Sequence, residues 1–102
     1  MSQTGYDLDQ QEEVTNKVSR PKKYNAVLLN DDYTPFDFVT ELLMEIFNKT
    51  IDESDQIAYT VHKEGKCVVG TYSKEICSTK VDKANLISKK SGFPLKVIME
   101  EA

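Results

Sequence analysis

The stretch LLNDDYTPFDF, residues 28–38, decides the fold because an apolar strand ends in it and a helix begins in it. The run KYNAVLL (23–29) combines aromatic and branched side chains, which is typical of a strand. Thr34 followed by Pro35, with an acid at Asp37, is the pattern of a helix start, since it offers an N-cap, a proline in the first turn and a capping box. We therefore expect a strand, a short polar loop and a helix whose N-cap is Thr34.

The first helix should bury a stripe of apolar residues at helical spacing, namely Phe38, Val39, Leu42, Leu43, Ile46 and Phe47. A second helix should begin at Thr50, where Thr50 and Glu53 form a capping box, and should end at a left-handed Gly65. The segments KCVVGTY (66–72) and PLKVIME (94–100) predict two further strands.

A third helix is expected between these strands, from an N-cap at Ser73 to about Lys90, with Ile76, Cys77, Val81, Ala84 and Ile87 facing inward. The resulting order, βααβαβ, predicts an α+β fold: a small two-layer sandwich with a three-stranded antiparallel sheet and three helices. Residues 1–20 are polar and lack periodicity, so we expect a flexible N-terminal tail before a folded domain over 21–102.

Composition narrows the class of protein. The length of 102 residues suits one small domain, and the net charge of −4 argues against a nucleic-acid-binding surface. No run approaches the roughly 18 apolar residues of a membrane span, and the start MSQTGYDLDQ lacks a secretory signal pattern, so we expect a cytoplasmic protein without membrane contact. Cys67 and Cys77 are interpreted as small buried residues, not as a disulfide, and we expect no structural metal and no cofactor.

The cluster Asn30, Asp31 and Asp32 has two interpretations. Asn and Asp favour turns through local side-chain hydrogen bonds, and we assign Asp32 to such a turn. Because Thr34 and Pro35 already supply the helix start, the turn does not require all three polar residues. At least one of them is therefore free to hold a positive charge.

His62 is the single histidine and lies near the end of the second expected helix. It either interacts with the helix dipole or takes part in a site. Together, Asn30, Asp31 and His62 offer hydrogen-bond acceptors that suit a cation with an apolar appendage, such as the free N-terminus of a peptide. Their spacing in the sequence does not by itself bring them together.

Four motifs, LLNDDYTPFDFV, VHKEGKCVVGTYSKE, STKV and PLKV, resemble the ClpS adaptors in order and separation over residues 22–102. The resemblance implies a monomeric, non-enzymatic adaptor that binds N-degrons, which are the destabilising N-terminal residues (Phe, Leu, Tyr and Trp) of proteins to be degraded. It also implies delivery of these proteins to a Clp AAA+ unfoldase, ClpA-like or ClpC-like, with its protease. The tail over 1–20 would then engage the unfoldase.

The resemblance also assigns roles to residues. The α-amino group of the substrate would be bound by Asn30, Asp31 and His62. The side-chain pocket would be lined by Thr34, Phe36, Val39, Ala58, Val61 and Leu95, with Leu28 behind it. The unfoldase-facing surface would contain Glu75 and Lys80, with Thr79 nearby. Several members carry Met where Phe36 and Ala58 stand, and an acid is often found at Ser78, so the side-chain preference and the interface can differ in detail.

Other interpretations remain open at this point. Without the resemblance, Glu75 and Lys80 are better interpreted as a first-turn acid and a solvated base. The same N-degron module could act with a ubiquitin-type ligase. A small enzyme could use Asp31 and His62 as a carboxylate–imidazole pair, although the sequence places no convincing nucleophile near them and has no phosphate loop. Asp31, Asp32 and His62 could also bind a divalent metal.

Overall fold

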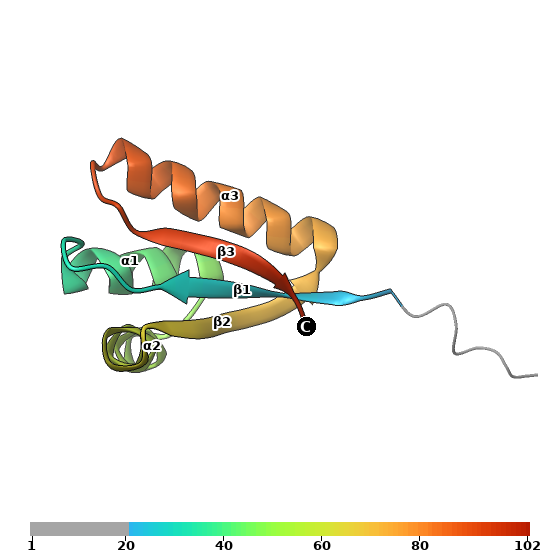
Figure 1. The fold of residues 1–102 in the computed structure, drawn as a ribbon, viewed down its shortest axis with the longest axis horizontal. Coiled ribbons are helices and arrows are strands. Elements are labelled where there is room, and N and C mark those ends of the chain that lie inside the picture. Colours follow the sequence, from blue (N-terminus) through green and yellow to red (C-terminus); the bar gives the residue numbers. More distant parts are fainter. Residues whose placement is uncertain (1–20) are drawn as a thin grey trace, which may run out of the picture.

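A three-stranded antiparallel sheet forms one layer of the structure, with the strand order β2–β1–β3 (Figure 1). The computed structural model describes residues 21–102, so the tail expected over 1–20 lies outside the described residues. The strands are β1 (Lys23–Leu29), β2 (Lys66–Ser73) and β3 (Lys96–Glu101). β1 begins and ends as predicted, β2 ends one residue later, and β3 begins two residues after the expected Pro94.

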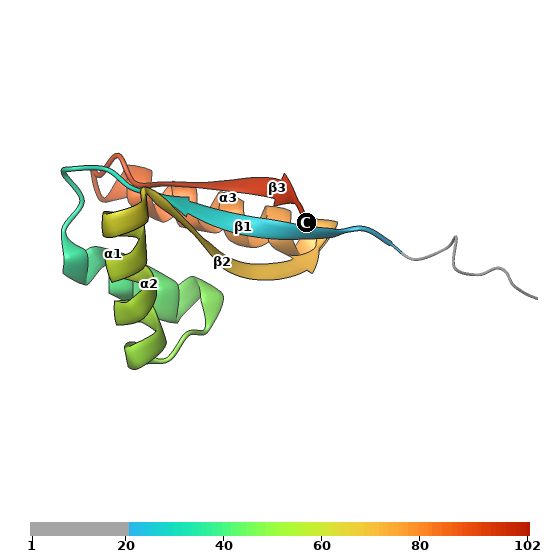
Figure 2. The same ribbon diagram turned by 60° about the horizontal axis from the view of Figure 1, so that its bottom comes forward.

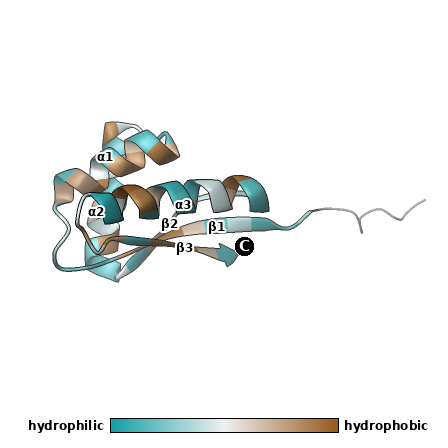
Figure 3. Ribbon diagram, turned by 90° about the horizontal axis from the view of Figure 1, so that it is seen from above, coloured by the Kyte–Doolittle hydropathy of each residue, from teal (hydrophilic) through white to brown (hydrophobic). Residues whose placement is uncertain are grey.

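Three helices form the second layer: α1 (Phe36–Phe47), α2 (Ile51–Glu64) and α3 (Lys74–Lys90). The observed order is βααβαβ, and the predicted α+β two-layer fold is confirmed. α3 extends along one face of the sheet, and α2 crosses α1 at the end of the sheet where β1 ends (Figure 2). Hydrophobic and hydrophilic residues alternate along α3, as expected for a helix with one face on the core (Figure 3).

The core lies between the sheet and the helices, because alternate residues of the strands point toward the helices. Its buried members are Ala26, Leu28, Leu42, Leu43, Phe47, Val61, Val69, Cys77, Val81, Ala84, Leu95 and Val97. Both cysteines are free; Cys77 is fully buried and Cys67 is half-buried, and burial raises the pKa of each thiol above its ordinary value. Within residues 21–102, none of the helices is both long enough and apolar enough to cross a membrane.

Two of the predicted helix starts are confirmed. Thr50 accepts a hydrogen bond from the Glu53 N–H (3.1 Å), and the Glu53 carboxylate accepts one from the Thr50 N–H (2.9 Å), which completes the capping box of α2. Ser73 accepts a bond from the N–H of Ile76 and caps α3. Gly65 ends α2 with φ of 92°, a value that favours glycine, and its N–H donates to the Val61 carbonyl (2.8 Å).

The predicted start of α1 is wrong in its details. Its N-cap is Pro35, and no side chain caps the helix. The hydroxyl of Thr34, expected to accept from the helix, instead donates to the carboxylate of Asp31. The same carboxylate also accepts from the N–H of Thr34 over 2.8 Å, so Thr34 belongs to the turn closed by Asp31, and the helix begins one residue later than predicted.

Ile76 was expected to face inward but is about half exposed, at 52%. The buried residues of α3 are Cys77, Val81, Ala84 and Ser88, which follow the spacing i, i+4, i+7 and i+11. Ile76 stands one residue out of phase with this face. Ser88 was not predicted to be buried, because its hydroxyl is polar and apolar patterning does not count it.

Candidate functional site

A cavity of about 460 Å³ opens where the end of β1, the start of α1 and the last two turns of α2 meet. Its lining residues come from three separate segments of the chain, within 29–39, within 58–62 and at position 95: Leu29, Asn30, Asp31, Asp32, Thr34, Phe36, Val39, Ala58, Tyr59, Val61, His62 and Leu95. The structure thus gathers nine of the ten residues predicted for substrate binding around one cavity, and Leu28 is the exception.

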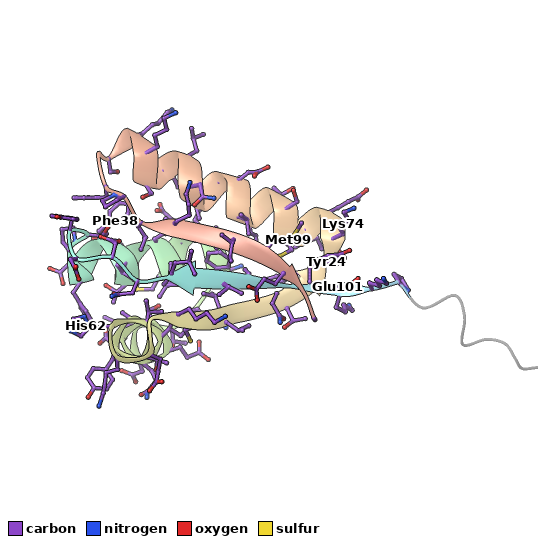
Figure 4. The ribbon with its side chains drawn as sticks, in the orientation of Figure 1. Tyr24, Phe38, His62, Lys74, Met99 and Glu101 are labelled. Carbon is purple, nitrogen blue, oxygen red and sulfur yellow. The ribbon has the colours of Figure 1, made fainter. Side chains whose placement is uncertain are left out.

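A backbone hydrogen bond joins the two polar segments of the cavity. The N–H of Asn30, directly after β1, donates to the carbonyl of Gly65, directly after α2, over 2.9 Å. His62 lies in the last turn of α2, so this bond holds Asn30 and His62 at the same end of the cavity. His62 lies between α2 and the loop that leads from β1 to α1 (Figure 4). Both side chains are exposed and therefore accessible to a ligand.

The carboxylate of Asp31 organises the loop between β1 and α1. It accepts bonds from the N–H of Tyr33 (2.8 Å) and the N–H of Thr34 (2.8 Å), both at Oδ1. The Thr34 hydroxyl lies 3.0 Å from Oδ1 and 2.8 Å from Oδ2. Three donors therefore surround Oδ1, and only the Thr34 hydroxyl, which is one of these three, also approaches Oδ2. This leaves acceptor capacity at Oδ2.

The same bonds keep Asp31 ionised. Burial, the largest single influence, raises the pKa of Asp31, but the hydrogen bonds from Tyr33 and Thr34 together outweigh it and hold the pKa below its ordinary value. The site therefore presents a negative charge on a fixed carboxylate.

The turn role belongs to Asp31 and not to Asp32, which corrects the expectation from the sequence. Asp31 makes the local bonds to Tyr33 and Thr34, whereas the exposed Asp32 lines the rim of the cavity. An aspartate that bonds to the N–H groups two and three residues later is the usual first residue of such a turn. The first acid of the pair is therefore the one that closes the loop.

The inner part of the cavity is apolar. Ala58, Val61 and Leu95 are nearly buried, with exposed fractions of 4, 4 and 5%. Val39 is half-buried beside them, and Phe36, half exposed, stands at the mouth. The cavity thus has an acceptor-rich end and an apolar end, an arrangement that suits a cation attached to an apolar group.

Leu28, predicted to lie behind the pocket, is fully buried in the core and does not itself line the cavity, whereas its neighbour Leu29 does. Successive side chains of a strand point to opposite faces, so a difference of one residue decides which of the two leucines reaches the cavity. Leu28 shares its face with Ala26, which is also buried in the core.

Three lining residues were not predicted: Leu29, Asp32 and Tyr59. Tyr59 is 55% exposed, and the Lys63 ammonium lies 5.7 Å from its ring centroid. It stands three residues before His62, a spacing that places two side chains on the same face of a helix. This spacing was the signal in the sequence that could have identified it.

Glu75, Thr79 and Lys80 line a second, shallower groove of about 570 Å³, which α3 forms with the end of α1. The Lys80 ammonium donates to the carbonyl of Ile46 over 2.9 Å and lies 5.4 Å from the ring centroid of Tyr72. Lys80 is half-buried and fastens α3 to the last turn of α1, so the interpretation of Lys80 as a merely solvated base is wrong.

The cavity shows no arrangement suited to covalent catalysis among its lining residues. Its one hydroxyl besides that of Tyr59, on Thr34, is bonded to the Asp31 carboxylate and has no bond to His62. Across residues 21–102, no three His, Cys, Asp or Glu side chains come together as metal ligands. The trio Asp31, Asp32 and His62 is therefore not arranged as a metal site.

Comparison with known proteins gives a consistent set of similarities. The family model described as "ATP-dependent Clp protease adaptor protein ClpS" matches residues 19–98. A ClpS adapter of Lawsonia intracellularis is 37% identical over 99% of this chain and 97% of its own length, and one of Vibrio atlanticus is 45% identical over 95 and 90%. The structure of Agrobacterium tumefaciens ClpS2 bound to L-phenylalaninamide superposes with a TM-score of 0.80 at 40% identity, over 81% of this chain and 100% of that one.

Proposed function

Because this chain belongs to the ClpS family of ATP-dependent Clp protease adaptors, we propose that its cavity binds the N-terminal residue of proteins to be degraded. The protein is an adaptor and not an enzyme, as its family is. The observation that carries the proposal is the cavity itself, in which Asn30, Asp31 and His62 stand at one end and buried apolar side chains at the other. A free N-terminal residue has the same two parts, an ammonium and a side chain.

The α-ammonium has three N–H donors and no acceptor. Asp31 Oδ2, the side-chain carbonyl of Asn30 and a ring nitrogen of a neutral His62 supply three acceptors from two segments. Hydrogen bonds to a charged group contribute about 1.5–3 kcal/mol each. An internal residue of a protein cannot replace this group, because its amide nitrogen is uncharged and carries the preceding chain.

The side chain of the first residue would enter the apolar end, between Val39, Ala58, Val61 and Leu95. Burial of a Leu or Phe side chain contributes roughly 1.5–3 kcal/mol. After the cost of ordering the peptide, an affinity of about micromolar strength is expected for a site of this size. The ligand of the A. tumefaciens relative supports the assignment, since L-phenylalaninamide is a single residue with a free amino group, a benzyl side chain and a carboxamide where a peptide would continue.

The partner of the adaptor is the unfoldase of a Clp protease, as the family implies. We infer that it is ClpA-like or ClpC-like and that the groove with Glu75, Thr79 and Lys80 faces it. We further infer that the adaptor works as a monomer in the cytoplasm. The match to Clp protease adaptors favours this role over a ubiquitin-type ligase module and over a small Asp/His-dependent enzyme.

A peptide panel that varies only residue one tests the proposed function. Ten-residue peptides with a C-terminal fluorophore and Phe, Leu, Tyr or Trp at the first position should bind with about micromolar affinity in anisotropy titrations. The same peptides with Ala or Gly first should bind at least about tenfold more weakly, since they lose the apolar burial. Equal affinity across the panel would show that residue one does not occupy the cavity.

The small side chain of Ala58 should allow the cavity to accept peptides whose first residue is Ile or Val. It lies one turn before His62 and lines the cavity, so it borders the region near the β-carbon of the bound residue. We expect Ala58→Met to lower the affinity for peptides that start with Ile or Val, which branch at this carbon, about three- to tenfold more than for a Leu-starting peptide. Thr60→Met, on the same helix but outside the cavity lining, is the matched control and should leave the Ile-to-Leu ratio unchanged. An equal loss for Ile and Leu peptides would mean that Phe36 and Val39 set the preference.

A further inference from the structure

The loop between α3 and β3 carries one wall of the cavity. Leu95, the residue before β3, is 5% exposed and lines the apolar end. The chain reverses direction at Gly92, whose φ of 82° is in the left-handed region, and then passes through Phe93 and Pro94. No regular strand or helix holds residues 91–95, so their position depends on individual contacts.

Ser88 makes the central contact with this loop. Its hydroxyl oxygen, in a residue only 2% exposed, lies 2.8 Å from the carbonyl of Leu95 and 3.1 Å from that of Phe93. The N–H of Phe93 donates back to the carbonyl of Ser88 over 3.0 Å. The side chain of Ser88 therefore holds the backbone on both sides of Pro94.

These bonds differ from those that a serine usually makes inside a helix. A helical serine commonly donates to the carbonyl four residues before it, within its own helix. Ser88 instead donates to carbonyls five and seven residues after it, outside α3. Its hydroxyl therefore acts on the loop and not on the helix that carries it.

Two neighbouring contacts fix the ends of the same loop. Asn85, one turn before Ser88, donates to the carbonyl of Val97 and accepts from its N–H, both over 2.9 Å. The ring of Phe93 packs on the ring of Phe38 in α1 with centroids 4.7 Å apart. Phe38 stands beside the segment that leads into β3 (Figure 4). Leu95 thus lies between Phe93 and Val97, which these contacts hold in place, and the Ser88 hydroxyl binds the carbonyl of Leu95 itself.

We propose that Ser88 is a positioning residue for substrate selection, which holds Leu95 as a pre-formed wall against the first side chain of the bound peptide. When Leu95 is already held in place, peptide binding does not have to pay the conformational entropy of ordering it. Loss of this ordering should therefore weaken peptide binding even though Leu95 is still present. This inference rests on the proposed function, since it specifies which part of the chain shapes the same cavity.

The test compares two buried serines. Ser88→Ala removes the hydroxyl that holds the loop, whereas Ser54→Ala removes a hydroxyl that is fully buried and has no hydrogen-bond partner among the described residues. Titration with a Phe-starting peptide should show an affinity about three- to tenfold lower for Ser88→Ala, the range expected for one neutral hydrogen bond, and a change of less than about twofold for Ser54→Ala. Circular dichroism and thermal unfolding establish that each variant is folded.

A second arm separates positioning from a general effect on the structure. In a Leu95→Ala background, Ser88→Ala should cause no further loss of affinity, because the wall on which it acts is gone. If Leu95→Ala does not fold, Leu95→Val serves instead, and the loss caused by Ser88→Ala should be smaller there than in the wild type. The same loss in both backgrounds would overturn the proposal, as would equal affinities of Ser88→Ala and Ser54→Ala.

The wild type distinguishes this inference from the proposed function. A wild-type protein that fails to bind the Phe-starting peptide overturns both statements. If the wild type binds that peptide and Ser88→Ala binds it equally well, the inference about Ser88 fails while the proposed function stands.

Discussion

Replacement of Asp31 by alanine should weaken the binding of a Phe-starting peptide about 30- to 150-fold, or roughly 2–3 kcal/mol. The change removes the one carboxylate that is fixed at the ammonium end of the cavity. It also removes the acceptor for the N–H groups of Tyr33 and Thr34, so the loop that carries the site loses its internal bonds. Isothermal titration with one peptide is sufficient to measure this loss.

Two further variants make the experiment specific. Asp32→Ala changes the neighbouring acid, which makes none of the hydrogen bonds within the loop. It should lower the affinity for the Phe-starting peptide by less than about threefold. Asp31→Asn keeps an oxygen that can accept from Tyr33 and Thr34 but removes the charge, so a loss close to that of Asp31→Ala would assign the effect to the ammonium contact. A larger loss for Asp32→Ala than for Asp31→Ala would show that the other carboxylate binds the substrate.

Acetylation of the peptide's α-amino group should abolish measurable binding, with a loss of at least about 100-fold. The acetyl group removes the positive charge and two of the three donors, and it adds bulk in the cavity that Asn30, Asp31 and His62 line. The carboxylate of Asp31 would then lose water without gaining a charged partner, which is the costly case.

The acetylated peptide requires a control for its altered charge. A peptide with a free N-terminus but an additional acidic residue near its C-terminus has the same net charge and should bind normally. Equal affinity of the acetylated and free peptides would exclude recognition of the ammonium and with it the proposed function. Competition against a labelled free-amine peptide measures both ligands under identical conditions.

Most of the fold could be predicted because local signals and global pattern agree in this chain. β1 is a run of branched and aromatic residues, and the capping box at Thr50 and the glycine at position 65 mark both ends of α2. The start of α1 was predicted wrongly because the Asp31 carboxylate, three residues earlier, binds both the N–H and the hydroxyl of Thr34 and holds it in the turn, which the capping pattern does not reveal.

The candidate site was predictable as a set of residues but not as a geometry. The acceptor residues were suggested by their chemistry and the apolar lining by the family resemblance. The backbone bond from Asn30 to Gly65, which brings β1 and α2 together, leaves no trace in side-chain patterns. Leu29, which lines the cavity, was not predicted, because its side chain follows the buried Leu28 at the very end of β1. Tyr59 was missed because an exposed tyrosine on a helix has many possible explanations.

The central place of β1 in the sheet has a mechanical consequence. β1 is the first element of the described chain, and it pairs with seven residues of β2 on one side and six of β3 on the other. At its N-terminal end, the N–H of Ala102 donates to the carbonyl of Lys23, and Lys22 pairs with Glu101. The hydrogen bonds of an antiparallel ladder lie perpendicular to the strands, so a pull along β1 toward its N-terminus loads both ladders in shear. A tensile force applied at that end must therefore rupture many bonds together instead of one after another.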